Sequence, residues 1–183
     1  MKSRLTIAAL LLTLSPLAHA TMMTWDGNGN SYEVITGEAT LTWDQASLLA
    51  ADMGGHLVTI TSAAENDFVS ELVSTYGSGD LQRYWLGGYQ VSQGEVEPLG
   101  TWAWVTGETW DYANWAPGEP NNGVGGSQQY LHYWPDVGLW DDMENRAVMD
   151  SFVVEYEVPE PASLALLGLG LIGAGAMRRR RAR

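Results

Sequence analysis

Two helix-start signals early in the chain, followed mainly by short strand-like segments, most constrain what this sequence can fold into. Residues 42–45 and 62–65 both match the capping-box pattern, in which a hydroxyl and a side chain three residues later satisfy free backbone N–H groups. The first signal predicts a helix to about Met53, where two glycines follow. The second predicts a helix to about Tyr76, where one glycine follows, because glycine ends helices at little conformational cost.

The strand-like segments lie mostly after these helices and do not alternate with them. They are residues 31–36, 56–60, 84–87, 102–105, 130–133, 138–140 and 152–157. Helices that come early, with no β–α–β alternation, favour an α+β fold with an antiparallel sheet. Residues 106–120 form a long turn-rich loop between strands, and its own aromatic side chains must pack it: Trp110, Tyr112 and Trp115.

Both ends of the 183-residue chain are typical of processing segments. Residues 1–20 have a basic start, an apolar middle and a small-x-small end, which is the pattern of a secretory signal peptide. Residues 158–183 carry a Pro-Glu-Pro motif, an apolar run at 162–177 and an arginine cluster. At about 1.5 Å per residue that run spans roughly 24 Å, short of a hydrocarbon core of roughly 30 Å. It predicts transient membrane association, with a marginal permanent anchor as the alternative.

The part between these segments has the length of one domain. Residues 21–30 are polar and glycine-bearing and predict an N-terminal arm, and residues 31–157 predict a single domain, long enough to bury a core. Residues 21–158 hold 21 of the 22 acidic residues but only two of the nine basic ones, a net charge of −19. Nucleic acid is therefore a poor partner, since binding it requires basic groups. The absence of cysteine excludes thiol catalysis and zinc–thiolate sites.

The stretch from Gly118 to Asp142 concentrates oxygen-bearing side chains at its two ends. If its apolar segment pairs as a hairpin beside the glycine loop, five side chains can converge: Glu119, Asn121, Gln128, Asp141 and Asp142. Carboxylate and amide oxygens suit Ca²⁺, which takes about 6–8 oxygen ligands. The stretch therefore predicts a Ca²⁺ site.

In order along the chain, these motifs resemble a C-type lectin-like domain over roughly residues 31–157. The resemblance rests on Trp43 with Ala46, residues 54–57, 64–66 and 84–87, Trp102 with Trp104, and residues 114–115, 117–122 and 139–142. It implies two helices, small antiparallel sheets, a long loop region that carries the binding site, and a cis Glu119–Pro120 bond. In sugar-binding members, Glu-Pro-Asn implies mannose-type recognition of adjacent equatorial hydroxyls.

The C-terminal segment resembles the PEP-CTERM sorting signal of certain Gram-negative bacteria. This resemblance implies processing by an exosortase and export to the cell surface or the extracellular polymer. Together with the signal peptide, it predicts an exported protein.

This sequence departs from the usual lectin pattern at two groups of positions. Four residues stand near the positions where cysteines are usual: Ala50, Tyr130, Asn145 and Val154. In the ligand set, Gln128 stands for a usual glutamate, allowing one inserted residue, and Asp141 stands for a usual asparagine. Gln supplies an NH₂ donor and Asp an acceptor, so the pair exchanges donor and acceptor for one sugar hydroxyl. Glu119 and Asn121 supply acceptor and donor for the other.

The predicted function is thus a non-enzymatic, calcium-dependent carbohydrate-binding module, with Trp115 and Trp134 as residues that could stack on sugar faces. An adhesive or structural matrix module is the alternative, in which calcium only orders the loop. A glycosidase, which needs two carboxylates about 5–10 Å apart, is less consistent with the motif, since a shared metal explains Glu119 and Asp142 better. His56 is interpreted as a packed histidine, and His132 lies near enough to the site for a role there.

Overall fold

The computed structural model describes residues 22–77, 83–92, 97, 100–123, 126–134 and 136–158. The predicted signal peptide and the sorting segment beyond Val158 lie outside these ranges. Within them, no helix combines the length and hydropathy needed to cross a bilayer.

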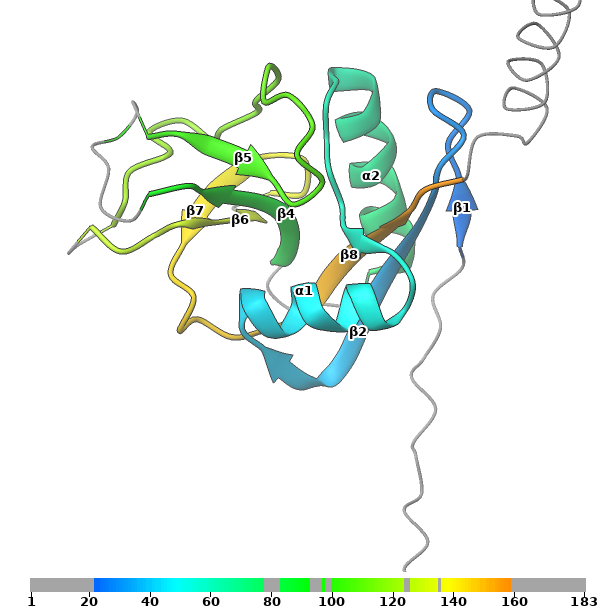
Figure 1. Cartoon of the computed structure of the whole chain (residues 1–183), viewed down its shortest axis with the longest axis horizontal. Helices are drawn as coiled ribbons and strands as arrows, with labels where there is room; N and C mark the ends of the chain where they lie inside the picture. Colours follow the sequence, from blue (N-terminus) through cyan, green and yellow to red (C-terminus); the bar gives the residue numbers. More distant parts are fainter. Residues whose placement is uncertain are drawn as a thin grey trace, which may run out of the picture.

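The described residues form two helices and one eight-stranded sheet (Figure 1). The helices are α1 (Trp43–Asp52) and α2 (Ala63–Tyr76). The strands are β1 (Met23–Thr24), β2 (Ser31–Leu41), β3 (His56–Leu57), β4 (Tyr84–Gln90), β5 (Trp102–Trp104), β6 (Tyr130–Tyr133), β7 (Trp140–Met143) and β8 (Met149–Tyr156). The predicted α+β class is confirmed.

Both predicted helices form, but only the first has a complete capping box. At α1 the Thr42 hydroxyl accepts the Gln45 N–H, and the Gln45 side chain accepts the Thr42 N–H. At α2 the Ser62 hydroxyl accepts the Glu65 N–H. The Glu65 carboxylate instead accepts the N–H and the hydroxyl of Thr61. The second capping box is therefore only half formed, because Glu65 is drawn into a buried polar network.

The sheet is mixed, with one parallel pairing. Its main path runs β1-β2-β8-β4-β6-β7, with β3 on β8 and β5 on β4. The long β2–β8 pair joins the two ends of the domain, and the neighbouring β4 and β8 run parallel at Trp85 and Phe152. All other pairings between the named strands are antiparallel, and the isolated bridge between Trp115 and Trp140 is parallel. The parallel contact was not predicted, because periodicity along the sequence does not reveal which strands become neighbours.

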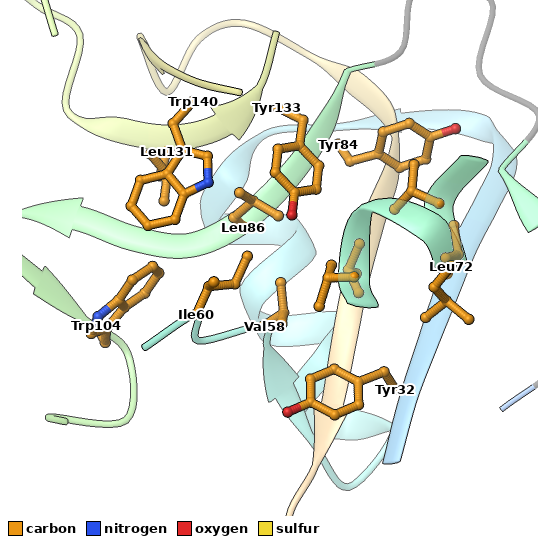
Figure 2. Close-up of a cluster of buried hydrophobic side chains, with 14 of the residues drawn as sticks. Tyr32, Val58, Ile60, Leu72, Tyr84, Leu86, Trp104, Leu131, Tyr133 and Trp140 are labelled. Carbon is orange, nitrogen blue, oxygen red and sulfur yellow. The ribbon is translucent and has the colours of Figure 1, made fainter. Parts of the chain in front are cut away.

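Two apolar clusters build the core on either side of the sheet. The larger cluster extends from Tyr32 on β2 and Leu72 on α2 to Trp104 on β5 and Trp140 on β7 (Figure 2). The second cluster packs α1 against the sheet through Trp43, and its other members include Trp85, Phe152 and Val154. Burial of large apolar side chains contributes about 1.5–3 kcal/mol each, so these clusters are the main source of stability.

Aromatic side chains hold the long loop against the sheet. Trp110 stacks on Trp104 with ring centroids 4.3 Å apart, and Trp115 meets Trp102 edge-on at 4.8 Å. Trp140 on β7 contacts Trp110 at 5.7 Å. Such pairs add about 0.5–1.5 kcal/mol each beyond the area they bury. The expected packing of this loop by its own aromatic residues is confirmed.

At the four positions where the related pattern has cysteines, the residues of this chain make packing contacts or hydrogen bonds. Ala50 and Val154 are both fully buried in the α1 cluster. Tyr130 packs on Trp43 at 4.7 Å, and Asn145 exchanges hydrogen bonds with Asp44. Tyr130 and Asn145 therefore both contact the start of α1, which links β6 and the segment after β7 to that helix.

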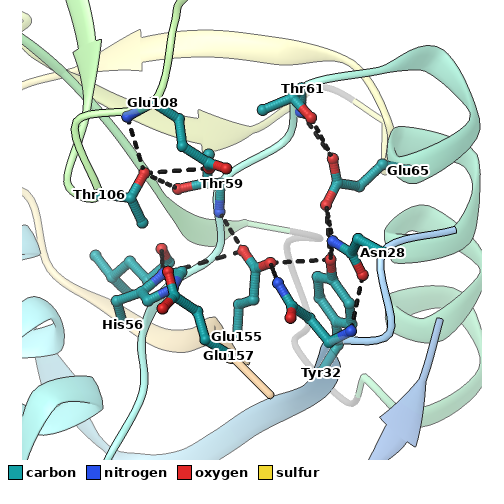
Figure 3. A network of polar contacts seen from close by, with 12 residues as sticks. Asn28, Tyr32, His56, Thr59, Thr61, Glu65, Thr106, Glu108, Glu155 and Glu157 are labelled. Atoms are coloured by element: carbon teal, nitrogen blue, oxygen red, sulfur yellow. Dashed lines mark hydrogen bonds and ion pairs between the residues drawn. The ribbon is translucent and has the colours of Figure 1, made fainter. Parts of the chain in front are cut away.

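A buried polar network ties the N-terminal arm to α2 and β8 (Figure 3). The Tyr32 hydroxyl lies 2.6 Å from Glu65 Oε1 and 3.0 Å from Glu155 Oε1. Asn28 donates to Glu65, and Asn30 donates to Glu155 and accepts the Val158 N–H. Both ends of the domain therefore meet at one pair of buried carboxylates.

Candidate metal and carbohydrate site

The long loop ends in a turn that docks on β7. The Ala116 N–H donates to the Trp140 carbonyl, and the Trp140 N–H donates to the Asn114 carbonyl. Gly118 follows with φ +97, and the Glu119–Pro120 peptide bond is cis, as the resemblance implied. This turn brings Glu119 next to the two aspartates that follow Trp140.

Asp142 joins β7 to the loop through its carboxylate. Its two oxygens accept the backbone N–H groups of Asn121 at 2.9 Å and Asn122 at 2.7 Å. The Asp142 side chain is fully buried. Asp142 therefore fixes the residues that follow the cis bond.

Three carboxylates converge at this junction. One ligand atom from each of Glu119, Asp141 and Asp142 lies within 4.8 Å of the others, and both aspartates are buried. Clustered anions of this kind could hold a metal ion, and hard divalent cations prefer oxygen ligands.

The electrostatics of this cluster favour a bound proton or cation. Burial, followed by the charge of Asp141 and a hydrogen bond with it and then by Asp142, raises the pKa of Glu119 to about 7. Burial also raises the pKa of Asp142, although the N–H groups of Asn121 and Asn122 oppose that rise. Three ionised carboxylates this close repel one another unless positive charge lies between them.

Asn121 and Gln128 lie beside Gly123. Asn121 Oδ1 accepts the Gly123 N–H at 2.6 Å. Gln128 Oε1 lies so close to Gly123 that a Cβ there would collide with it. Gln128 Nε2 points to the sulfur of Met143 at 3.8 Å. The structure therefore brings Gln128 to the glycine loop.

Two buried oxygens at this junction have no donor within the described residues. They are Glu119 Oε2 and Gln128 Oε1. A buried acceptor without a partner costs roughly 1–3 kcal/mol, and buried polar atoms in native proteins normally have a protein, water or ion partner. The three carboxylates therefore fit a hard cation, whereas no contact among the described residues brings the side-chain amide oxygens of Asn121 and Gln128 to that group.

His132 on β6 is the cross-strand neighbour of Asp141 on β7. The two residues are paired across β6 and β7, and His132 Nε2 lies 3.2 Å from Asp141 Oδ2. His132 is fully buried. The sequence placed His132 near the loop but did not give its partner, because that partner follows from the strand register.

The two tryptophans predicted to stack on sugar lie in different settings. Trp115 is part of the aromatic cluster with Trp102, Trp110 and Trp140. Trp134 is 36% exposed and lies beyond the end of β6, with the Arg83 guanidinium 5.9 Å from its ring centroid. Most of the Trp115 ring is therefore occupied by other aromatic side chains, whereas Trp134 keeps an exposed face.

Comparison with protein families gives two matches. The family model described as Lectin C-type domain matches residues 39–145, and the PEP-CTERM protein-sorting motif matches residues 157–181. The chain therefore belongs to the C-type lectin domain family, a family of non-enzymatic binding domains. The sorting motif implies exosortase processing and an exported, surface-directed protein.

Individual relatives support the same assignment. Ladderlectin of Oncorhynchus mykiss is 31% identical over 66% of this chain and 60% of its own length. The chain thus spans under two thirds of that relative. A crystal structure of the cow C-type carbohydrate-recognition domain of CD23, in the presence of a GlcNAc2Man3 oligosaccharide, has a TM-score of 0.58 at 23% identity, covering 79% of this chain and 97% of that one. A calcium-independent type II antifreeze protein has a TM-score of 0.54 at 24% identity, covering 78% and 93%. The fold is therefore shared by domains with different uses.

Proposed function

We propose that this protein is an exported, surface-sorted module that binds carbohydrate through a calcium ion held at the loop–β7 junction. The observation that carries the proposal is the convergence of Glu119, Asp141 and Asp142, with an orphaned oxygen on Glu119. A charge of −19 over residues 21–158 also favours a cation over an anionic ligand.

In this proposal, five residues supply the metal ligands: Glu119, Asn121, Gln128, Asp141 and Asp142. Bound Ca²⁺ would supply a Lewis-acidic centre for two sugar hydroxyls. Around it, Glu119 and Asp141 accept hydrogen bonds from those hydroxyls, and Asn121 and Gln128 donate amide hydrogens to them. For Gln128 to donate in this way, its NH₂ must turn from Met143 toward the ligand.

The proposed ligand class is a mannose-type sugar or a related polysaccharide. Support comes from the Glu-Pro-Asn motif at residues 119–121 and from the oligosaccharide present with the related CD23 domain. Trp134 is the proposed stacking residue with the more accessible ring.

Calcium titration of the metal-free protein by calorimetry tests the metal site. We expect saturable binding by the wild type and at least about tenfold weaker binding by Glu119→Gln, since one anionic ligand is lost. Glu119→Gln is a cleaner probe than a change at Asp142, which also holds two backbone N–H groups. Asp111→Asn is the matched control, because Asp111 is an exposed carboxylate of the same long loop. Equal affinity for wild type and Glu119→Gln would overturn the metal assignment.

A mannose column tests the sugar. We expect retention with calcium and elution by chelator. Passage through the column with calcium bound would favour the adhesive or structural module instead. The turn of Gln128 Nε2 toward Met143 is the observation consistent with that alternative.

A further inference from the structure

His132 on β6 lies next to the carboxylate cluster and contacts one of its members, Asp141. Its ring is fully buried, and the edge of Trp85 on β4 packs against it at 5.9 Å and 70°. Across the hairpin, Nε2 lies 3.2 Å from Asp141 Oδ2. Because an ionised carboxylate only accepts, Nε2 carries the hydrogen in this pair.

The other ring nitrogen of His132 gains nothing from its surroundings. Nδ1 is buried and has no hydrogen-bond partner among the described residues. A buried polar nitrogen without a partner is costly, so a purely apolar side chain would suit this packing position better. The hydrogen bond to Asp141 is the interaction that an apolar side chain at position 132 could not make.

We propose that His132 is a positioning residue for Asp141, holding Oδ2 so that the carboxylate keeps one orientation toward Glu119 and Asp142, where the proposed calcium ion would bind. This inference rests on the proposed function. It assigns to β6 a residue that acts on the metal through Asp141 and touches neither metal nor sugar.

The same contact bears on sugar recognition. Asp141 was assigned as both metal ligand and hydroxyl acceptor, and the histidine already occupies one lone pair of Oδ2. A sugar hydroxyl that uses Oδ2 must therefore approach on the side away from His132. His132 thus fixes the orientation of one of the two acceptors for sugar hydroxyls.

Calcium affinity of two His132 variants tests the proposal. His132→Leu removes the donor, and we expect about tenfold weaker binding, the lower end of what loss of an orienting partner costs a metal site. His132→Gln can present an amide N–H near the position of Nε2, and we expect it to restore most of the affinity. His56→Gln is the control, since His56 lies on β3 and contacts Glu155 and Glu157 instead.

A double-mutant cycle separates positioning from general destabilisation. In the Asp141→Ala background, we expect His132→Leu to change calcium affinity less than twofold, because the carboxylate through which it acts has been removed. An equal loss in both backgrounds, or a loss that Gln fails to restore, overturns the proposal. The proposal is also overturned if the variants lose calcium affinity only in proportion to a lower melting temperature of their metal-free forms.

Failure of the proposed function gives a different result. If the wild type binds no calcium, both ideas fall together. If the wild type binds calcium and His132→Leu binds it equally well, only the role of His132 is overturned.

Discussion

The Glu119 carboxylate is held beside Asp141 and Asp142 by a turn whose backbone is fixed by the loop and β7. Burial and the two neighbouring carboxylates raise its pKa to about 7 from an ordinary value of 4.5. In the metal-free protein this residue therefore favours the protonated form below about pH 7, and a bound cation would replace the proton as the source of positive charge.

This raised pKa predicts how stability depends on pH. The folded metal-free protein binds the Glu119 proton more tightly than the unfolded chain, so this stabilising contribution is complete below about pH 4.5 and is lost as pH rises toward 7. We expect the melting temperature in chelator to fall over this range, and the fall to shrink in saturating calcium. Thermal melts at several pH values measure both. A Glu119→Gln profile that keeps the full fall would show that another group causes it.

Glu119→Gln should separate stability from binding at the same residue. At pH 8 the substitution removes one of three mutually repelling charges, so we expect the metal-free melting temperature to rise by about 3 °C. In saturating calcium the order should reverse, because the wild type gains more from binding. Differential scanning calorimetry with and without calcium provides the comparison, and a lower metal-free melting temperature for the variant would contradict the repulsion argument.

At the scale of elements, α2 is fastened to the β6–β7 hairpin by Asn66. Its buried Oδ1 accepts Trp140 Nε1–H at 2.9 Å and the Tyr133 hydroxyl at 3.2 Å, and its Nδ2 donates to the Gly138 carbonyl at 3.0 Å. Trp140 immediately precedes Asp141, so the helix helps to set the strand that carries the candidate ligands.

Asn66→Ala should therefore weaken both the fold and the site. The change leaves Trp140 and Tyr133 without their buried acceptor, and we expect a loss of about 3 kcal/mol of unfolding free energy, with weaker calcium binding. Urea denaturation measures the first and calorimetry the second. Ser74→Ala on the exposed face of α2 is the control, and a loss at Asn66 no greater than at Ser74 would refute this role.

Across the whole molecule, the domain closes where its two ends meet. The β2–β8 pair and the network of Tyr32, Glu65 and Glu155 join β2 and α2 to the last strand. Glu65 and Glu155 are buried, and burial raises the pKa of Glu155. Chain closure thus depends on polar groups that must remain hydrogen-bonded.

Tyr32→Phe should destabilise the whole domain by about 2 kcal/mol, because the two buried carboxylates lose the one hydroxyl hydrogen that they share. Amide hydrogen exchange should accelerate in β1, β2 and β8 more than at the candidate site. Calcium affinity should stay within about twofold of wild type, since this network lies apart from the three site carboxylates. An unfolding free energy unchanged within about 0.5 kcal/mol would show that Tyr32 contributes only its ring.

Much of this organisation is readable along the chain. Capping at Thr42, helix ends next to glycines and the cis Glu119–Pro120 turn are local patterns, and each forms close to where it was predicted. The strand predicted at residues 138–140 instead forms as β7 and shares only Trp140 with that prediction. Strand lengths were less accurate: β2 extends to Leu41, while β3 stops at Leu57 although Val58 and Ile60 remain buried. Hydrogen-bond partners set these limits, and residue type does not reveal them.

By itself, the sequence determined the class of fold, the residues available as ligands and the chemistry they favour, because all three depend on residue type and short-range spacing. Only the tertiary structure decided which of those side chains meet. Strand register pairs His132 with Asp141. The turn that docks on β7 places Glu119 next to Asp142. Gln128 packs against Gly123, which has no side chain to exclude it. These are contacts between segments distant in the sequence, and cross-strand pairing and burial select them.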